Sequence, residues 1–472
     1  MSGIHADEQA FLDRIRACPD DDAPRLALAD WLERRGDPRG EFIRIDLAYT
    51  RCDPNNCSFH ALRQRRDGYL KQHEESWLQP LRDLGIRKRG VDVGYERGLV
   101  SWMSVKAGGV FPEKAEAILQ AFPLLTGISF FDAKVDLEAL AQSPFLARFT
   151  GLGFYSDTAD EKGLQALTAS PHVRSLRQLT WMGTATGPAA AAALAESDHL
   201  EELRELDLTY AKLGPEGLQA FLRSTRLPRL QKLNLSNNDL GPESAALLAA
   251  TTAFPELIEL QVACNDLGPE GMETLAAAPL LLSLKIFNPS LNAGGPDGIA
   301  ALAKAPLAQL QSLNLYGEDI EWDGAAALAR APWLPGIKSL VLESNDLDAE
   351  SLQLLLDAPG LERLEELDLS SNWLGNDGLA VLCSRPWPKL VKLEVRANGI
   401  APEGLVALTS SSRFPRLRDL RLSSNRLGDA GASLLAASPH LRELAWLWVE
   451  ECGFGEESES VLKDRFGEAL IL

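Results

Sequence analysis

Cys52, Cys57 and His60 are the residues whose types and spacing come closest to a chemical site. Cysteine and histidine are the usual ligands of zinc, but the C-x4-C-x2-H spacing matches no common closed zinc site. A fourth ligand would have to come from another segment, as Cys18 or His73. The sequence therefore predicts no metal and no cofactor.

Patterns typical of catalysis do not emerge elsewhere. No nucleotide-binding glycine loop and no Ser/His/Asp constellation can be recognised, and the six histidines lie mostly in segments predicted as helices or caps. The consecutive acids Asp20–Asp22 precede Pro24 and an apolar helical pattern, which is typical of a helix N-terminus and not of a metal site. We therefore expect that the protein is not an enzyme.

One pattern of leucines organises most of the chain. The stretch Leu230–Leu257 reads L-x-x-L-x-L-x-x-N-x-L, then Gly-Pro-Glu, a helical run and leucine again. The same frame begins at Leu125, Phe149, Leu176, Leu203, Leu230, Leu257, Leu281, Leu310, Ile337, Leu364, Leu390, Leu417 and Leu444. Most steps are 26 or 27 residues, and only those from 125 to 149, 257 to 281 and 281 to 310 depart from this. A period of this length predicts a solenoid.

Each repeat combines a strand with a helix. Apolar residues at offsets 3 and 5 from the repeat start alternate with polar ones, which predicts a strand. Gly-Pro-Glu-Gly, as in residues 214–217, predicts the start of a helix. At offset 8, where the chain leaves the strand, we expect polar side chains to satisfy buried backbone groups. They are Asn238, Asn265, Asn345, Asn372, Asn398 and Asn425, with Cys452 in the same place.

A strand plus a helix in every 27 residues resembles the ribonuclease-inhibitor-like class of leucine-rich repeat over residues 125–455. Helices are about 10 Å wide whereas strands pack about 4.8 Å apart, so the helical side of such an array must be longer. We expect an α/β solenoid bent into a horseshoe, with a parallel sheet on the concave face and helices outside.

The N-terminal segment carries a second resemblance. Residues Pro19–Leu26, Ala29–Glu33 and Gly36–Arg44 closely resemble the repeat-companion domain at the N-terminus of many leucine-rich-repeat proteins of planctomycetes and myxobacteria. The resemblance covers about the first 48 residues. It implies a bacterial protein in which this domain accompanies a repeat array, and it transfers no functional residue.

These patterns predict four regions. Residues 1–50 form the helical repeat-companion domain, in three short helices, and residues 51–98 form a helical linker and N-terminal cap. Residues 99–455 form the solenoid. Residues 456–472, with a helix from about Ser458 to Phe466, form a C-terminal cap that covers the last strand.

The charge is concentrated in the repeats. The formal net charge is −20, from 47 basic and 67 acidic residues, and residues 1–97 hold 17 basic and 18 acidic ones. An acidic array repels phosphates and anionic lipids, so we expect no nucleic acid and no membrane partner. Asp7 and Glu8 stand where a signal peptide would be basic, and the cysteines follow no disulfide spacing. We therefore expect a cytoplasmic protein with reduced thiols.

Residues at offsets 2, 4 and 6 are expected to face the hollow of the horseshoe. Aromatic residues there are of the types enriched in interface hot spots, and neighbouring acidic residues would suit a basic ligand. The candidate partner-binding residues are Phe131, Tyr155, Phe287, Tyr316, Glu343, Glu366, Asp368, Arg396, Arg421, Trp446 and Trp448. An enlarged loop expected after Leu281, and the acidic loop Tyr316–Trp322, mark a possible binding edge.

These observations predict a monomeric, non-enzymatic scaffold that binds a protein or peptide on its concave face. One alternative is a regulator of a small GTPase, since Ran GTPase-activating proteins share this repeat type. Another is a structural protein that self-associates through Trp446 and Trp448.

Overall fold

The computed structural model describes residues 6–54, 56, 59–86, 90–106, 113–131, 135–155, 159–183 and 186–472. The chain divides into two compact units. Unit 1 contains Met1–Asp53, Ser58–Lys212 and Arg223–Leu230, and unit 2 contains Pro54–Cys57, Leu213–Leu222 and Gln231–Leu472.

Unit 1 begins with helices. The three short helices expected in residues 1–50 are confirmed, and they bury Leu12, Ile15, Leu28, Leu32, Ile43 and Leu47 in one core. Their bounds are α1 Ala6–Ala17, α2 Ala23–Glu33 and α3 Arg39–Arg51, and they are followed by α4 Phe59–Trp77 and α5 Gln79–Asp83. The acids before α2 have separate roles: Asp21 Oδ1 accepts the N–H of Ala23, whereas Asp22 pairs with Arg51 and Arg97.

Within each unit the strands form a sheet whose order follows the chain. The first two strands, β1 Val91–Glu96 and β2 Leu99–Val105, pair antiparallel, and β2 then pairs parallel with β3. The repeats supply β3 Gly127–Phe131, β4 Gly151–Tyr155, β5 Gln178–Met182, β6 Glu205–Asp207, β7 Lys232–Asn234, β8 Glu259–Gln261, β9 Ile286–Asn288, β10 Ser312–Asn314, β11 Ser339–Val341, β12 Glu366–Asp368, β13 Lys392–Glu394, β14 Asp419–Arg421 and β15 Trp446–Trp448. The last strand is β16 Leu470–Ile471.

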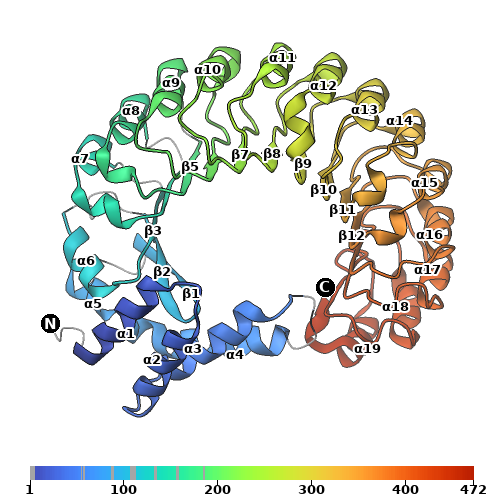
Figure 1. The fold of residues 1–472 in the computed structure, drawn as a ribbon. Helices are drawn as coiled ribbons and strands as arrows, with labels where there is room; N and C mark the ends of the chain where they lie inside the picture. Colours follow the sequence, from blue (N-terminus) through green and yellow to red (C-terminus); the bar gives the residue numbers. More distant parts are fainter. Residues whose placement is uncertain are drawn as a thin grey trace. The chain divides into compact units, whose positions relative to one another are not determined.

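One helix accompanies each repeat. In unit 2 the helices lie on the outer side of a curve and the strands line its inner, concave side (Figure 1). The helices are α6 Ala115–Ala121, α7 Leu137–Ala141, α8 Glu161–Thr168, α9 Pro188–Glu196, α10 Gly214–Phe221, α11 Glu243–Ala250, α12 Gly268–Ala276, α13 Gly295–Ala303, α14 Glu321–Leu328, α15 Ala349–Leu356, α16 Gly375–Cys383, α17 Pro402–Thr409, α18 Gly428–Ala437 and α19 Glu456–Phe466. Short 3-10 helices precede several strands: η2 Pro144–Arg148, η3 Pro171–Val173, η4 Pro279–Ser283, η5 Leu334–Gly336 and η6 Leu361–Arg363.

The core lies between the strands and the helices. In the repeat that starts at Leu230, the leucines at offsets 0, 3, 5 and 10 are all buried, as are Ala245 and Leu248 of α11. Side chains of a strand alternate between its two faces, so the residues at offsets 2 and 4 face the concave side. The α/β solenoid expected from the sequence is confirmed.

The repeat frame at Leu281 is wrong by three residues. β9 pairs Ile286 with Ser312 and Phe287 with Leu313, so the repeat begins at Leu284. The steps then become 27 and 26 residues, and the enlarged loop expected here does not exist. The error arose because Leu281 and Leu284 are both buried leucines, and Leu281 belongs to η4, which precedes the strand.

Asparagines at offset 8 link consecutive repeats. Asn372 is buried, and its Nδ2 donates to the carbonyls of Leu342, Leu369 and Ser370 at 2.9–3.0 Å. Its Oδ1 accepts the N–H groups of Asn345 and Leu347, at 3.1 and 2.9 Å. The predicted role of these asparagines is confirmed, and they tie each loop to the one before it.

A glycine opens many of the helices. At offset 11, just before the helix, six repeats place a glycine with φ between +53° and +68°, a region that residues with a side chain disfavour. These are Gly214, Gly241, Gly268, Gly295, Gly375 and Gly428. In the repeat that starts at Leu310, Glu321 holds this place with φ +54°.

The last strand covers the edge of the sheet in unit 2. β16 follows α19 and the 3-10 helix η7 Gly467–Ala469, and it pairs parallel with β15, matching Leu470 with Leu447 and Ile471 with Trp448. This arrangement agrees with the cap expected in residues 456–472, although the predicted domain boundaries themselves stay predictions. None of the helices in the described ranges combines the length and apolar character of a membrane span.

We predict that Asn372→Ala lowers the free energy of unfolding by about 1–3 kcal/mol, because buried donors and acceptors lose their partners. Urea denaturation followed by circular dichroism measures the change. Gln353→Ala, an exposed change on the helix of the preceding repeat, is the control and should stay within about 0.5 kcal/mol of wild type. An unchanged urea midpoint for Asn372→Ala would contradict the stabilising role given to the asparagines at offset 8.

Deleting residues 456–472 should make the protein aggregate, since it removes β16 and leaves the backbone of β15 unpaired at the sheet edge. Size-exclusion chromatography with light scattering would detect this. Replacing Leu472 alone by serine is the matched control and should leave the protein in its original state. A truncated protein that is as stable and as soluble as wild type would refute the capping role.

Candidate functional site

In unit 1, aromatic rings gather on the face of β2, β3 and β4 that is opposite the core. Phe131 and Tyr155 are half-buried, and their rings stack with centroids 4.2 Å apart and planes at 6°. Trp102 lies over the Cα atoms of Gly127 and Gly151, and its Nε1 donates to Ser129 Oγ at 3.0 Å. The structure thus adds Trp102 to this surface.

The sequence carried a signal for Trp102 that was missed. Two consecutive repeats have glycine at offset 2, where other repeats have larger side chains. A Cβ atom at Gly127 or Gly151 would collide with the indole ring of Trp102. Consecutive glycines at a surface offset therefore indicated a large side chain lying across neighbouring strands.

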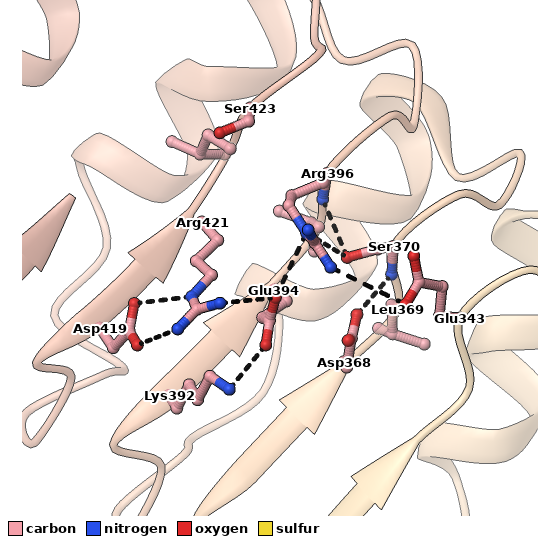
Figure 2. Close-up of polar contacts among 12 residues, drawn as sticks. Glu343, Asp368, Leu369, Ser370, Lys392, Glu394, Arg396, Asp419, Arg421 and Ser423 are labelled. Carbon is pink, nitrogen blue, oxygen red and sulfur yellow. Dashed lines mark hydrogen bonds and ion pairs between the residues drawn. The ribbon is translucent and has the colours of Figure 1, made fainter. Parts of the chain in front are cut away.

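In unit 2, charged side chains from three strands form one network on the concave face (Figure 2). Its centre is Glu394 of β13, only 5% exposed, which pairs with Lys392 at 2.7 Å, Arg396 at 3.3 Å and Arg421 at 3.5 Å. Arg421 also pairs with Asp419 through Nε and Nη2, at 3.2 and 3.0 Å. Arg396 reaches back to Glu343, at 3.8 Å. The network fixes these side chains before any partner binds.

Acidic groups outnumber basic ones in this network. Burial, followed by the charge of Glu394, raises the pKa of Asp368 above its usual value. Burial and the charge of Asp368 likewise raise the pKa of Glu343. Both carboxylates therefore lie in surroundings where an added positive charge would be favourable.

The two C-terminal tryptophans adjoin this network. The half-buried rings of Trp446 and Trp448 stack with centroids 6.1 Å apart. The guanidinium carbon of Arg421 lies 4.8 Å from the ring centroid of Trp448, a cation–π contact. The C-terminal strand β16 pairs beside Trp448, but it leaves both rings partly accessible.

Two polar atoms at this end of unit 2 lack a partner in the described chain. Trp448 Nε1 and Ser423 Oγ are buried, and neither makes a hydrogen bond with a described residue. Such groups are uncommon in folded proteins, because each costs the free energy of its lost hydration. A bound acceptor, such as a peptide carbonyl, would satisfy the indole N–H.

The remaining predicted site residues are distributed differently. Tyr316 is half-buried just beyond β10, and Glu366 is exposed on β12, where it accepts a hydrogen bond from Ser339 Oγ at 3.0 Å. The placement of Phe287 on the concave face is wrong: it is 1% exposed and packs in the core. The shifted frame explains this, and Ile286 and Asn288 take the concave positions instead.

Cysteine positions offer no metal site in the described part of the chain. No group of three or more His, Cys, Asp or Glu side chains there could hold a metal ion, and Cys18, Cys264, Cys383 and Cys452 form no disulfide. Cys57, part of the zinc pattern considered above, lies outside the described residues.

In unit 2, Glu318 interrupts the series of asparagines at offset 8, which we call the asparagine ladder. With the corrected frame, Asn292 and Glu318 occupy offset 8 in their repeats, and both are fully buried. Glu318 Oε1 accepts the N–H of Asn292 at 2.6 Å, and Oε2 accepts that of Gly294 at 2.9 Å. Burial raises the pKa of Glu318 to about 7, although the two backbone N–H groups oppose the shift and Asp319 adds to it.

Glu318→Asn should remove a pH dependence of stability. Because the pKa of Glu318 is raised in the folded state, the folded chain holds this proton more tightly, and stability falls as pH rises from about 4.5 to about 7. One such proton contributes a slope of at most about 1.4 kcal/mol per pH unit. An asparagine would accept both N–H groups through one oxygen, as Asn292 Oδ1 does for Asn265 and Leu267.

Urea denaturation from pH 4.5 to pH 8 measures this slope. Asp319→Asn is the matched control, since it removes an exposed acidic charge that is only the smallest cause of the raised pKa, and it should keep most of the slope. Equal slopes for wild type and Glu318→Asn would contradict the assignment.

Comparison with known proteins agrees with the repeat assignment. A family model described as Leucine Rich repeat matches residues 199–222, 227–249, 257–276, 363–383 and 416–436. No curated protein matches the chain.

Two solved structures are similar to the chain at 15% identity. The crystal structure of the Rad7 and Elc1 complex in yeast aligns with 78% of this chain and 92% of that chain, with a TM-score of 0.49. An internalin from Listeria monocytogenes aligns with 81% of this chain and 91% of its own, with a TM-score of 0.33. The family-model segments coincide with the repeats of β6, β7, β8, β12 and β14, so the chain carries leucine-rich repeats.

Proposed function

We propose that this protein is a non-enzymatic scaffold that binds a protein or peptide on the concave face of unit 2, across β10 to β15. The observation that carries the proposal is the charged network around Glu394, which adjoins the stacked rings of Trp446 and Trp448. A surface that only faces water does not need charged side chains held in fixed positions, whereas a binding surface gains affinity from them. Side chains already held in place lose little entropy when a partner binds.

The chemistry of this face favours a neutral or basic partner. Asp368 and Glu343 sit where burial and neighbouring acids disfavour their negative charge, so a lysine or arginine of the partner would relieve them. The indole rings offer apolar contact area, and the buried N–H of Trp448 offers a donor to a main-chain carbonyl. Together these groups suit an extended peptide better than a small molecule.

Unit 1 carries a second group of candidate residues. Phe131, Tyr155 and Trp102 form an aromatic surface on the face of β2 to β4 opposite the core. Aromatic residues recur among the hot spots of protein interfaces. We propose this cluster as a further contact surface for a protein partner.

Photo-crosslinking tests the face that binds. A benzophenone amino acid placed at Trp446 or Tyr316 should form adducts with a partner protein in cell extract. The same group at Val406, which is 47% exposed on helix α17, is the control and should form none of these adducts. Adducts that form equally well from Val406, or only from Val406, would overturn the proposed face.

Affinity capture with a variant provides the quantitative measure. Trp446→Ala, Trp448→Ala and Tyr316→Ala combined should weaken capture of the crosslinked partner by about tenfold or more, because aromatic anchors carry much of an interface's affinity. Val406→Ala should leave capture unchanged. A partner that is retained fully by the triple variant would show that the concave face does not bind it.

Two further functions stay open as predictions from the sequence. Stimulated GTP hydrolysis across a panel of small G proteins would favour a GTPase regulator. Concentration-dependent light scattering that disappears in the triple variant would favour self-association through the tryptophans. Either result in place of a captured partner would replace the scaffold proposal.

A further inference from the structure

Two exposed tryptophans lie on the edge of unit 2 where strands pass into helices. Trp322 is 52% exposed at the start of α14, and Trp373 is 73% exposed between β12 and α16. The other eight tryptophans of the chain are all buried or half-buried. Indole rings left in water forgo the free energy of burial, and exposed apolar groups of this size often mark an interaction site.

Hydrogen bonds from both neighbouring repeats reach the same loop, Asn345–Asp348, which follows β11. Glu321 donates its N–H to the carbonyl of Asn345 at 3.2 Å, and this places the adjacent Trp322 beside the loop from the preceding repeat. From the following repeat, Trp373 donates its backbone N–H to the carbonyl of Leu347 at 2.8 Å. Its Nε1 donates to Asp346 Oδ1 at 2.9 Å. The loop is therefore bonded from one side by the residue before Trp322 and from the other side by Trp373.

The surroundings of the two indoles are uniformly acidic. The strand-to-helix segments 316–324, 343–351 and 370–377 together hold nine Asp and Glu residues and no Lys or Arg. In the described chain, Asp319, Glu321 and Asp346 are exposed and form no ion pair. On the concave face, by contrast, arginines and a lysine pair with several of the carboxylates. These three segments contribute no such basic partner of their own.

Glu321 has a backbone conformation that is unusual for a residue with a side chain. It occupies the offset at which six other repeats place a glycine, and it adopts the same positive φ, +54°. A residue with a side chain is disfavoured in that conformation. Its carboxylate makes no ion pair within the described residues, so it stays available to a partner's positive charge.

We propose that Asp319, Glu321, Trp322, Asp346 and Trp373, the Trp322–Trp373 patch, form a second docking surface that takes a basic segment of a partner protein. Lysine or arginine side chains of that segment lie over the indole faces, where the ring quadrupole attracts a cation, and pair with the surrounding carboxylates. An acidic segment is excluded by charge. The patch lies on the loop edge, so it can act whether or not the concave face is occupied.

Binding of a short fluorescein-labelled peptide of alternating arginine and glycine to the full chain tests the proposal, at about 0.15 M salt. Trp322→Ala with Trp373→Ala should weaken binding by about tenfold. Asp319→Asn, Glu321→Gly and Asp346→Asn combined should weaken it similarly. Asparagine and glycine tolerate the positive φ angles of these three positions, so the loops should keep their conformation.

Matched controls separate the patch from the general acidity of the protein. Asp239→Asn, Asp266→Asn and Glu270→Gln remove three exposed carboxylates from the same edge in other repeats, and Trp448→Ala disrupts the concave face. Neither control should change the affinity by more than about twofold, the scatter expected for distant sites. Equal losses in the patch variant and the carboxylate control would overturn the proposal, and so would equal binding of a glutamate–glycine peptide.

Fluorine NMR of protein labelled with 5-fluorotryptophan locates the contact directly. The signals of Trp322 and Trp373 are identified by their absence from Trp322→Phe and Trp373→Phe. The arginine–glycine peptide should shift these two signals first and leave those of Trp446 and Trp448 in place. Shifts confined to Trp446 and Trp448 would assign the basic segment to the concave face and refute the patch.

Discussion

The hydrogen bonds of the residues at offset 8 are the interaction on which the rest of unit 2 depends. Each repeat leaves its strand through a tight loop, and the backbone groups of that loop are buried between neighbouring repeats. The Nδ2 of Asn372 donates to carbonyls of its own repeat and of the preceding one, and its Oδ1 accepts an N–H from the loop of the preceding repeat. Because each link joins one loop to the next, the repeats hold a common register.

This register decides what the inner face can do. Once the leucines are fixed toward the helices, the alternating side chains at offsets 2 and 4 must point away from the core. Neighbouring strands then bring Asp368, Glu394 and Arg421 together, although they lie in different repeats. The network in Figure 2 is therefore a consequence of register and not of local sequence.

The loops that contain the residues at offset 8 also form the exposed edge of unit 2 between its strands and helices. Glu318 belongs to the ladder, and its neighbours Glu321 and Trp322 belong to the acidic surface that we assign to a basic partner. One loop thus combines a buried carboxylate, whose pKa is raised to about 7, with an exposed indole. The concave face and the loop edge give unit 2 two chemically different surfaces.

The sequence by itself determined the repeat, the strand and helix in each period, and the ladder asparagines, because these follow from spacings that recur many times. It placed the strand residues correctly in twelve of its thirteen frames and failed at Leu281, where a second leucine three residues away offered an equally apolar start. Only the tertiary structure decided which leucine begins that repeat, since pairing with Ser312 and Leu313 fixes the register. It alone revealed the Glu394 network, Trp102 over two glycines, and the hydrogen bonds of Glu321 and Trp373 to one loop, because these contacts join residues that no local pattern connects.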